Sequence, residues 1–475
     1  MKKISLPEPD EVFKERPSVR KYLRYLSFFG PGAIIASVTI GQGQLILGPQ
    51  IGAWSDLRLL WLITINVASY IIAYLSCRYT LLTGLNMMDV FSTKLRGLLN
   101  ILFIVIMLIF IPLFAATIVT SLGQSLAWIF GFGDYLFWGI SFALLAVILA
   151  VVGRYRLLEY TQLAFVFILA VGAIISVAMI RDLNLLDIVP HFFTIGDFPR
   201  YPEWVYEIGE ATKPIPLLVL GYLGTLTITI VTLISYTGWV KVKGWGIFKG
   251  KRDPEKLSKE LFSIYKRSGK VDYLSPDEEE VRKAVMLTRP VLIDLSLAFI
   301  FVSLASAAYM IAGYYLLGPR HELPTDMDLL RRQALIFSSI SPWLKPLYQV
   351  SVFFALFGTI YGGFEAASRM LYETSKSLFE KVSRADYQRF MKMFLIYILT
   401  TGIPLAILVR FGLSVIILLT LTLLFIGVIG VIIYGIGTLY AIKTTLPREY
   451  APLHHLVLGI VALIMLIIPF FSFAA

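Results

Sequence analysis

Charged residues are scarce in this chain. Of its 475 residues only 15% are charged, whereas 57% are hydrophobic. A soluble protein of this length carries roughly a quarter charged residues, so the scarcity excludes an ordinary soluble globular protein. Runs of about 20 apolar residues, the length that crosses a bilayer, recur along the whole chain. The composition therefore indicates a multi-pass membrane protein.

Cysteine and catalytic motifs are also lacking. Cys77 is the single cysteine, which excludes an internal disulfide. The sequence has no P-loop, no zinc-ligand spacing and no hydrolase triad, so we expect neither an enzyme nor a bound cofactor. The net charge of +11 does not indicate nucleic-acid binding, because the basic residues lie in short loops between apolar runs. The expected partners are a small solute or cation and the lipid bilayer, and the oligomeric state stays open.

Eleven apolar runs are present, each long enough to span a bilayer. They cover residues 28–53, 58–79, 98–127, 134–153, 157–180, 214–240, 290–317, 346–371, 391–409, 411–441 and 452–473. If the N-terminus is cytoplasmic, most of the 42 lysines and arginines fall on the cytoplasmic side, as the positive-inside rule requires. We therefore expect a cell-membrane protein with a cytoplasmic N-terminus and an external C-terminus.

The order of the spans predicts an N-terminal tail, a core of two repeats, a basic cytoplasmic insert and an extra C-terminal helix. A solvated loop that touches anionic lipid headgroups is the simplest interpretation of the insert, and a regulatory surface is the alternative. The predicted bounds are 1–27 for the tail, 28–441 for the core, 28–180 for the first repeat, 214–441 for the second repeat, 241–289 for the insert and 442–475 for the extra helix.

Two of the runs carry glycine and polar residues near their middle. The first contains GQGQ at 41–44, and the sixth contains GTLTIT at 224–229. Five spans separate the two interruptions, which is typical of a five-plus-five inverted repeat with broken helices at corresponding positions. We therefore expect an all-α integral membrane fold in which helices 1 and 6 are unwound at these two places.

The two interruptions are the predicted binding site. Unpaired backbone groups are costly in hydrocarbon unless they line a cavity in the protein, where freed carbonyls, amides and hydroxyls can hold an ion or a polar solute. Close helix packing is the alternative interpretation of the glycines. The predicted substrate-binding residues are Gly41, Gln42, Gly43, Gln44, Gly224, Thr225, Thr227, Ile228, Thr229 and Glu365. Whether a metal binds stays open, with Gln44 and the backbone carbonyls of Gly41 and Thr225 as its candidate ligands.

An acidic residue inside an apolar run indicates a functional site by default, and two such residues are candidates here. Glu365 is one of them, but Arg369 follows four residues later, so a structural ion pair along the helix is the alternative. The other is Asp294, about one turn into the seventh run. We expect Asp294 at the membrane interface, with a role in a gate as the alternative.

The first run resembles the first span of the Nramp family of divalent-metal transporters. In that family a Gly-Pro pair leads to Asp-Pro-Gly-Asn and then to a second Gly-rich stretch. Here Gly-Pro at 30–31 leads to GQGQ at 41–44. Gly41 therefore takes the position of the metal-binding Asp, Gln42 that of Pro and Gln44 that of Asn. In the sixth run, the family's Met-Pro-His is matched by Ile228, Thr229 and Ile230.

The resemblance implies the inverted-repeat fold of the LeuT or amino-acid transporter type and transport by alternating access. It also implies a cation as substrate, with a divalent metal as one candidate. However, the family's carboxylate and thioether ligands are missing here, and stretches 101–123 and 394–409 lack the ionisable residues of the family's proton route. Two alternatives therefore stay open: a transporter of a small polar organic solute, and a non-transporting membrane sensor or scaffold.

Overall fold

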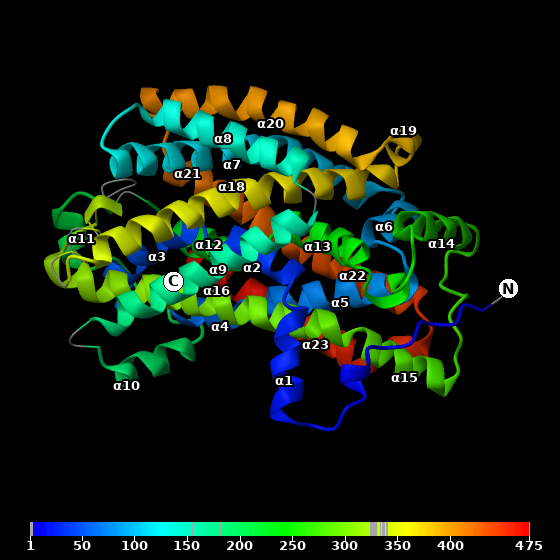
Figure 1. Ribbon diagram of the computed structural model, residues 1–475. Coiled ribbons are helices and arrows are strands. Elements are labelled where there is room, and N and C mark those ends of the chain that lie inside the picture. Colours follow the sequence, from blue (N-terminus) through cyan, green and yellow to red (C-terminus); the bar gives the residue numbers. More distant parts are fainter. Residues whose placement is uncertain are drawn as a thin grey trace.

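The apolar runs of the sequence form long helices (Figure 1). The computed structural model describes residues 3–474 except 154, 181–182, 212, 324–329, 333, 335–337 and 339–340. In this part of the chain, ten helices are long and apolar enough to cross a membrane, and a bent pair makes an eleventh. The predicted all-helical membrane fold with eleven spans is therefore confirmed.

The spans begin with the bent pair α2 and α3 and end with α23. Their bounds are α2 Pro31–Thr39, α3 Gln42–Ser55, α4 Trp61–Ile65, α5 Val67–Thr83, α7 Leu98–Phe130, α8 Tyr135–Val152, α9 Tyr155–Ala178, α12 Ile215–Leu226, α13 Ile230–Lys243, α16 Arg289–Leu316, α18 Leu344–Lys376, α20 Tyr387–Leu408, α21 Val415–Leu423, the π-helical turn η7 Leu424–Ile429, α22 Gly430–Thr445 and α23 Leu453–Ile467. Shorter helices are α1 Val19–Tyr25, α6 Met87–Lys94, α10 Leu185–Ile188, α11 Glu203–Glu207, α14 Pro254–Ser268, α15 Glu278–Leu287 and α19 Glu380–Arg384.

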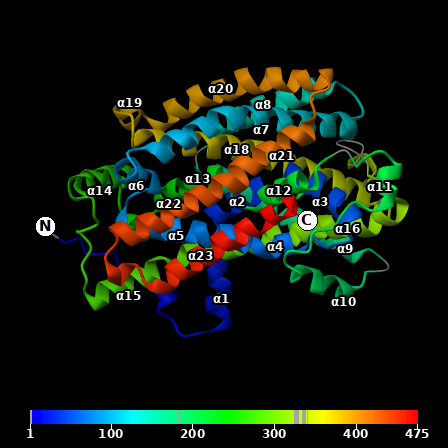
Figure 2. The same cartoon turned by 180° about the vertical axis from the view of Figure 1, so that it is seen from behind.

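The half-helix α2 lies inside the bundle rather than on its surface. It packs against α9, α16, α18 and α13, while α3 packs chiefly against α16 and α12. Helices α7, α8 and α20 form a layer along one side, and α18 lies between this layer and α2 (Figures 1 and 2). The first broken span is therefore enclosed by other spans, which is where broken backbone is tolerated in a membrane.

The first break is shorter than predicted. Helix α2 ends at Thr39 and α3 begins at Gln42, with a bend of 49° between them. The expectation of an unwound stretch over 41–44 is therefore wrong, because residues 42–44 form the first turn of α3. Ile40 and Gly41 redirect the chain, and a Cβ on Gly41 would lie 2.1 Å from the Oγ1 atom of Thr359. Glycine is needed here for close approach rather than for a long unwound loop.

The second break is likewise confined to a short stretch. Helix α12 continues to Leu226, Thr227 and Thr229 are extended, and the Thr229 hydroxyl accepts a hydrogen bond from the backbone N–H of Thr232 as the N-cap of α13. The predicted unwound turn at 224–229 is thus corrected to 227–229. Residues at the start of the predicted turn stay helical, and the Thr225 hydroxyl there bonds back to the carbonyl of Tyr222 in its own helix.

The N-terminal tail and the insert pack together at one end of the bundle, called here the N-tail end. The backbone N–H of Ile4 donates to the carbonyl of Tyr273 at 2.8 Å, and that of Leu6 donates to the Glu280 carboxylate at 2.7 Å. Glu8 forms an ion pair with Lys283 at 3.0 Å. The tail therefore covers part of the insert, and the two form one cap over the ends of the spans.

Candidate functional site

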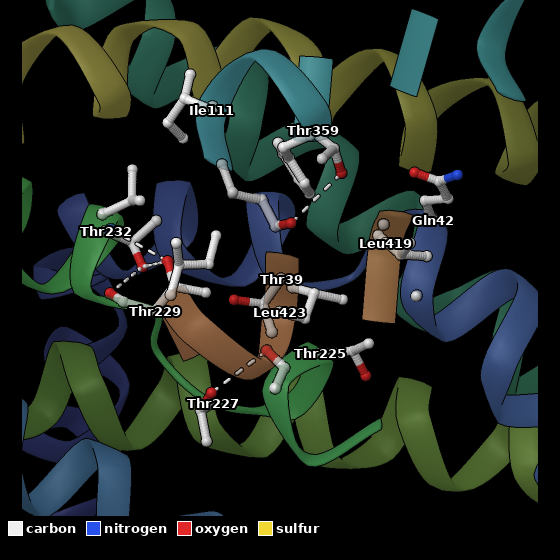
Figure 3. A pocket seen from close by; sticks show the side chains of 18 residues that line it. Thr39, Gln42, Ile111, Thr225, Thr227, Thr229, Thr232, Thr359, Leu419 and Leu423 are labelled. Carbon is white, nitrogen blue, oxygen red and sulfur yellow. Dashed lines mark hydrogen bonds between the residues drawn. The ribbon is translucent and has the colours of Figure 1, made fainter. Parts of the chain in front are cut away.

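A cavity of about 40 Å³ lies where the two broken spans face each other (Figure 3). It has room for about three water molecules. Seven predicted site residues line it, namely Gly41, Gln42, Gly43, Gly224, Thr225, Thr227 and Thr229. The remaining lining residues are not among the ten predicted binding residues. They include the polar side chains of Thr39, Thr232 and Thr359 and the apolar side chains of Val38, Ile111, Phe114, Val231, Leu419, Leu423 and Ile426.

Gln42 supplies an amide at the wall of this cavity. Its Nε2 donates to the Ser121 hydroxyl at 2.6 Å and to the Thr117 carbonyl at 3.3 Å, both on α7. Its Oε1 is buried and has no hydrogen-bond partner among the described residues. Because a buried acceptor without a partner is costly, this oxygen is available for a ligand that donates a hydrogen bond.

Gln44 lies behind the cavity and joins the two broken spans. Its Nε2 donates to the carbonyl and to the hydroxyl of Thr225, each at 3.1 Å. Beside it, a Cβ on Gly43 would lie 2.1 Å from the Cγ2 atom of Thr225. Gln44 therefore fixes α3 against α12. Contrary to the prediction from sequence, its side chain does not line the cavity.

The threonines around the cavity present oxygen acceptors. The Thr225 hydroxyl donates to the Tyr222 carbonyl at 2.7 Å, and the Thr227 hydroxyl donates to the Gly427 carbonyl at 2.7 Å. Thr359 donates to a carbonyl of its own helix at 2.8 Å. Since each hydroxyl proton is already used, the lone pairs of the oxygen are what remains for a ligand.

Charged and sulfur-containing side chains are missing from this cavity. Among the described residues that line it there is no Asp, Glu, Lys, Arg, His, Cys or Met, and the described part of the chain contains no cluster of three His, Cys, Asp or Glu that could hold a metal ion. The predicted carbonyl ligands also have partners, since the Gly41 carbonyl accepts from the N–H of Leu45 and that of Thr225 from Gln44. The site offers neutral oxygen and no preformed metal cage.

Two other predicted residues lie away from the cavity. Ile228 is fully buried, and its backbone N–H donates to the Ser69 hydroxyl at 3.1 Å. Glu365 accepts from the indole N–H of Trp239 at 2.6 Å and pairs with Arg369 at 2.7 Å. The ion pair that was the alternative interpretation of Glu365 is therefore present, and the carboxylate does not reach the central cavity.

Asp294 is buried and holds the N-terminus of α2. Its carboxylate accepts from the backbone N–H of Gly30 at 2.8 Å, from that of Gly32 at 2.7 Å and from the Tyr236 hydroxyl at 2.8 Å. Its side chain is fully buried among these donors, so Asp294 is enclosed by the protein, while its level at the membrane interface stays a prediction. The carboxylate also complements the positive end of the helix dipole.

Further buried charges lie at the N-tail end. Glu373 on α18 pairs with Lys241 on α13 and with Lys376, both at 2.9 Å. Glu255 on α14 reaches the same two lysines, at 3.4 Å for Lys241 and 2.5 Å for Lys376. Burial alone would raise the pKa of Glu255, but the two lysines outweigh it and hold this pKa well below its ordinary value. The insert thus contributes one carboxylate to a charge cluster between α13 and α18. Both of these spans also contribute residues to the cavity wall.

Sequence comparisons do not identify a family, whereas comparisons of structure identify a fold. No model of a known protein family matches the chain, and no curated protein matches its sequence. A crystal structure of a manganese transporter mutant from Eremococcus coleocola matches with a TM-score of 0.65 at 14% identity, over 96% of this chain and 88% of that chain. The same transporter in complex with an aromatic bis-isothiourea substituted compound matches with a TM-score of 0.64 at 14% identity, over the same shares of the two chains.

A second kind of transporter shares the architecture. Mhp1, a nucleobase-cation-symport-1 family transporter, was solved in a closed conformation with bromovinylhydantoin bound. It matches with a TM-score of 0.55 at 12% identity, over 94% of this chain and 92% of that chain. At such identities the likeness shows the fold alone. The predicted fold class, an all-α integral membrane fold with broken first and sixth spans, is confirmed.

Proposed function

We propose that this protein is a secondary transporter that moves a small cation or a polar solute across the membrane by alternating access. The observation that carries the proposal is the cavity at the meeting point of the two breaks, lined by seven of the ten predicted site residues. Broken spans at half-depth are where transporters of this architecture place their substrates. The similar folds of a manganese transporter and of a nucleobase-cation-symport-1 family transporter support the same activity.

The chemistry of the cavity favours a substrate other than a transition-metal ion. Transition metals prefer thiolate, thioether or imidazole ligands, and hard divalent cations prefer carboxylates, none of which line the cavity. Neutral oxygens suit a weakly bound cation. The unpartnered Oε1 of Gln42 and the threonine lone pairs equally suit an organic solute that donates hydrogen bonds. We keep an Nramp-like divalent-metal transporter as the less favoured form of the proposal.

Transport into liposomes tests the proposal. The purified protein is reconstituted, and uptake of Mn²⁺, Na⁺ and small amines and amides is measured. Thr359→Val removes an oxygen that lines the cavity, and Thr80→Val is the matched control, because Thr80 is a buried threonine that bonds back to its own helix on α5. We expect Thr359→Val to lower uptake of the transported solute while Thr80→Val leaves it unchanged. Equal uptake in both variants, or no flux of any solute, contradicts the proposal and favours a scaffold.

The proposed orientation places the N-tail end in the cytoplasm. The tail, the insert and the tail-side loops carry most of the lysines and arginines, which marks the cytoplasmic side. We further propose inverted repeats over 28–180 and 214–441. Single cysteines introduced at Ser263 in the insert and at Phe411 at the opposite end test the orientation in intact cells. An impermeant maleimide that reacts with the Ser263→Cys variant before the Phe411→Cys variant contradicts it.

A further inference from the structure

Helix α1 carries an exposed apolar stripe outside the spans. Val19 is 77% exposed, Tyr22 57%, Leu23 62% and Leu26, just after the helix, 56%. Their spacing of three, one and three residues places all four on one face of a helix. Four large apolar side chains on a helix outside the spans form a patch of the kind that marks an interaction surface.

The opposite face of α1 is held by the tail. The Ser18 hydroxyl caps the helix by accepting from the backbone N–H of Lys21, whose ammonium group donates to the Glu15 carbonyl at 2.5 Å. The rings of Phe13 and Tyr25 lie 5.7 Å apart. These contacts fix the rotation of α1, so the apolar stripe points away from the tail because the other face is already occupied.

The direction and charge of α1 match a bilayer surface. In both views α1 runs across the direction of the spans and projects from the bundle (Figures 1 and 2). The short turn Leu26–Phe28 joins α1 to Gly30, the N-cap of α2, so α1 lies beside the point where the first span begins. Arg20 and Arg24 are both exposed. Arg20 flanks the stripe, and Arg24, farther round the helix, pairs with Glu15 of the tail while its side chain stays 51% exposed.

We propose that α1 lies in the plane of the bilayer, on the leaflet at the N-tail end. Its apolar stripe enters the boundary between headgroups and acyl chains, while Arg20 and Arg24 contact anionic headgroups. An apolar face flanked by basic residues is the pattern of interfacial helices, and each basic residue near an anionic surface strengthens the attachment. This contact of α1 with the bilayer does not depend on which substrate is transported. It holds the N-terminus of α2 at the membrane boundary.

Spin labelling tests this attachment in the full-length protein. The single native cysteine, Cys77, is fully buried, so Leu23→Cys provides one accessible thiol for a nitroxide label. Ser263→Cys, at an exposed position in the middle of α14, is the matched control. Both labelled proteins are reconstituted in phosphatidylcholine vesicles with and without phosphatidylglycerol. Collision of the label with oxygen, which concentrates in hydrocarbon, is compared with collision with a water-soluble nickel chelate.

We expect the ratio of oxygen to nickel accessibility to be several-fold higher at position 23 than at position 263. Phosphatidylglycerol raises it further, and Arg20→Gln combined with Arg24→Gln removes that increase. Equal ratios at the two positions overturn the proposal. A high ratio at position 23 that falls to the value at position 263 when the lipid-to-protein ratio is raised also overturns it. In that case the label was shielded from nickel by a second copy of the chain and not by lipid. Cys77 that stays unlabelled shows that each variant is folded.

Discussion

Replacing Asp294 by asparagine should release the N-terminus of α2. The carboxylate accepts three hydrogen bonds, two of them from backbone N–H groups at 2.7 and 2.8 Å. Asn keeps one acceptor oxygen and turns the other into an amide group, which cannot accept from an N–H. Hydrogen bonds to a charged group are worth about 1.5–3 kcal/mol and neutral ones about 1 kcal/mol. The docked position of α2 therefore loses about 3 kcal/mol.

If undocking of α2 opens the cavity towards the N-tail end, this loss changes the ratio of docked to undocked molecules about a hundredfold, at about 1.4 kcal/mol per tenfold. Thr39→Cys, at the cavity wall on α2, reports the opening through its rate of alkylation from the N-tail side. We expect Asp294→Asn to raise that rate by up to about the same factor. Tyr236→Phe, which removes one bond and keeps the carboxylate, should raise it about tenfold, for a loss of about 1.5 kcal/mol.

Two results would contradict a role of Asp294 in opening the cavity. An Asp294→Asn protein that unfolds at a lower temperature but alkylates Thr39→Cys at the parental rate shows that the carboxylate stabilises the fold without controlling the opening. A rate increase with Tyr236→Phe equal to that with Asp294→Asn would show that the hydroxyl, rather than the helix N-terminus, is the contact that matters. Both variants are measured beside Thr80→Val, a buried change on α5.

Gly41→Ala should abolish uptake, because its Cβ would lie 2.1 Å from the Thr359 hydroxyl; adding Thr359→Ala restores part of the uptake in the same liposome assay, and no rescue contradicts the steric account. Gln42→Leu should weaken substrate binding about tenfold, the worth of one or two buried hydrogen bonds, as measured by the concentration dependence of uptake. Burial raises the pKa of Glu255, but Lys241 and Lys376 outweigh it and hold this pKa below its ordinary 4.5. The ion pairs therefore stabilise the docking of α14 above pH 4.5, and this stabilisation is lost as the pH falls below that value. Proteolysis of α14 at acid pH should increase, and Glu255→Gln should remove this pH dependence; an unchanged dependence refutes it.

The breaks could be predicted from sequence, whereas the orientation of side chains around them could not. Glycine and amide side chains in an apolar run mark a break because hydrocarbon does not tolerate them otherwise. The exact break at Gly41 sets the phase of α3, and residues two apart on a helix point about 200° apart. Gln42 therefore faces the cavity while Gln44 faces α12. On α18 the same relation separates Gly363, which lines the cavity, from Glu365, which does not.

The capping role of Asp294 had no sequence signal because the helix end that it caps presents only backbone N–H groups, far along the chain. Gly30 and Gly32 precede it by more than 260 residues, and an N–H group is present at every residue except proline. By contrast, the pair of Glu365 with Arg369 was foreseen because the spacing of four residues on one helix brings the side chains together. Local pairs can be read from spacing, but a side chain that caps a distant half-helix becomes visible only in three dimensions.

The two halves of the first span are held by different forces, which assigns them different roles. Helix α3 meets α16 through backbone contact, since a Cβ on Gly52 would lie 2.0 Å from the Met310 carbonyl and one on Gly313 would lie 2.1 Å from the Pro49 carbonyl. Such close apolar packing leaves no room for sliding, so these two helices should move as one body. Helix α2 also packs against α9, α16 and α18, but its N-terminus is held by the Asp294 carboxylate, a polar contact that water can replace. We therefore expect the bend at Ile40 and Gly41 to separate a fixed half from a half that can be released, with the cavity between them.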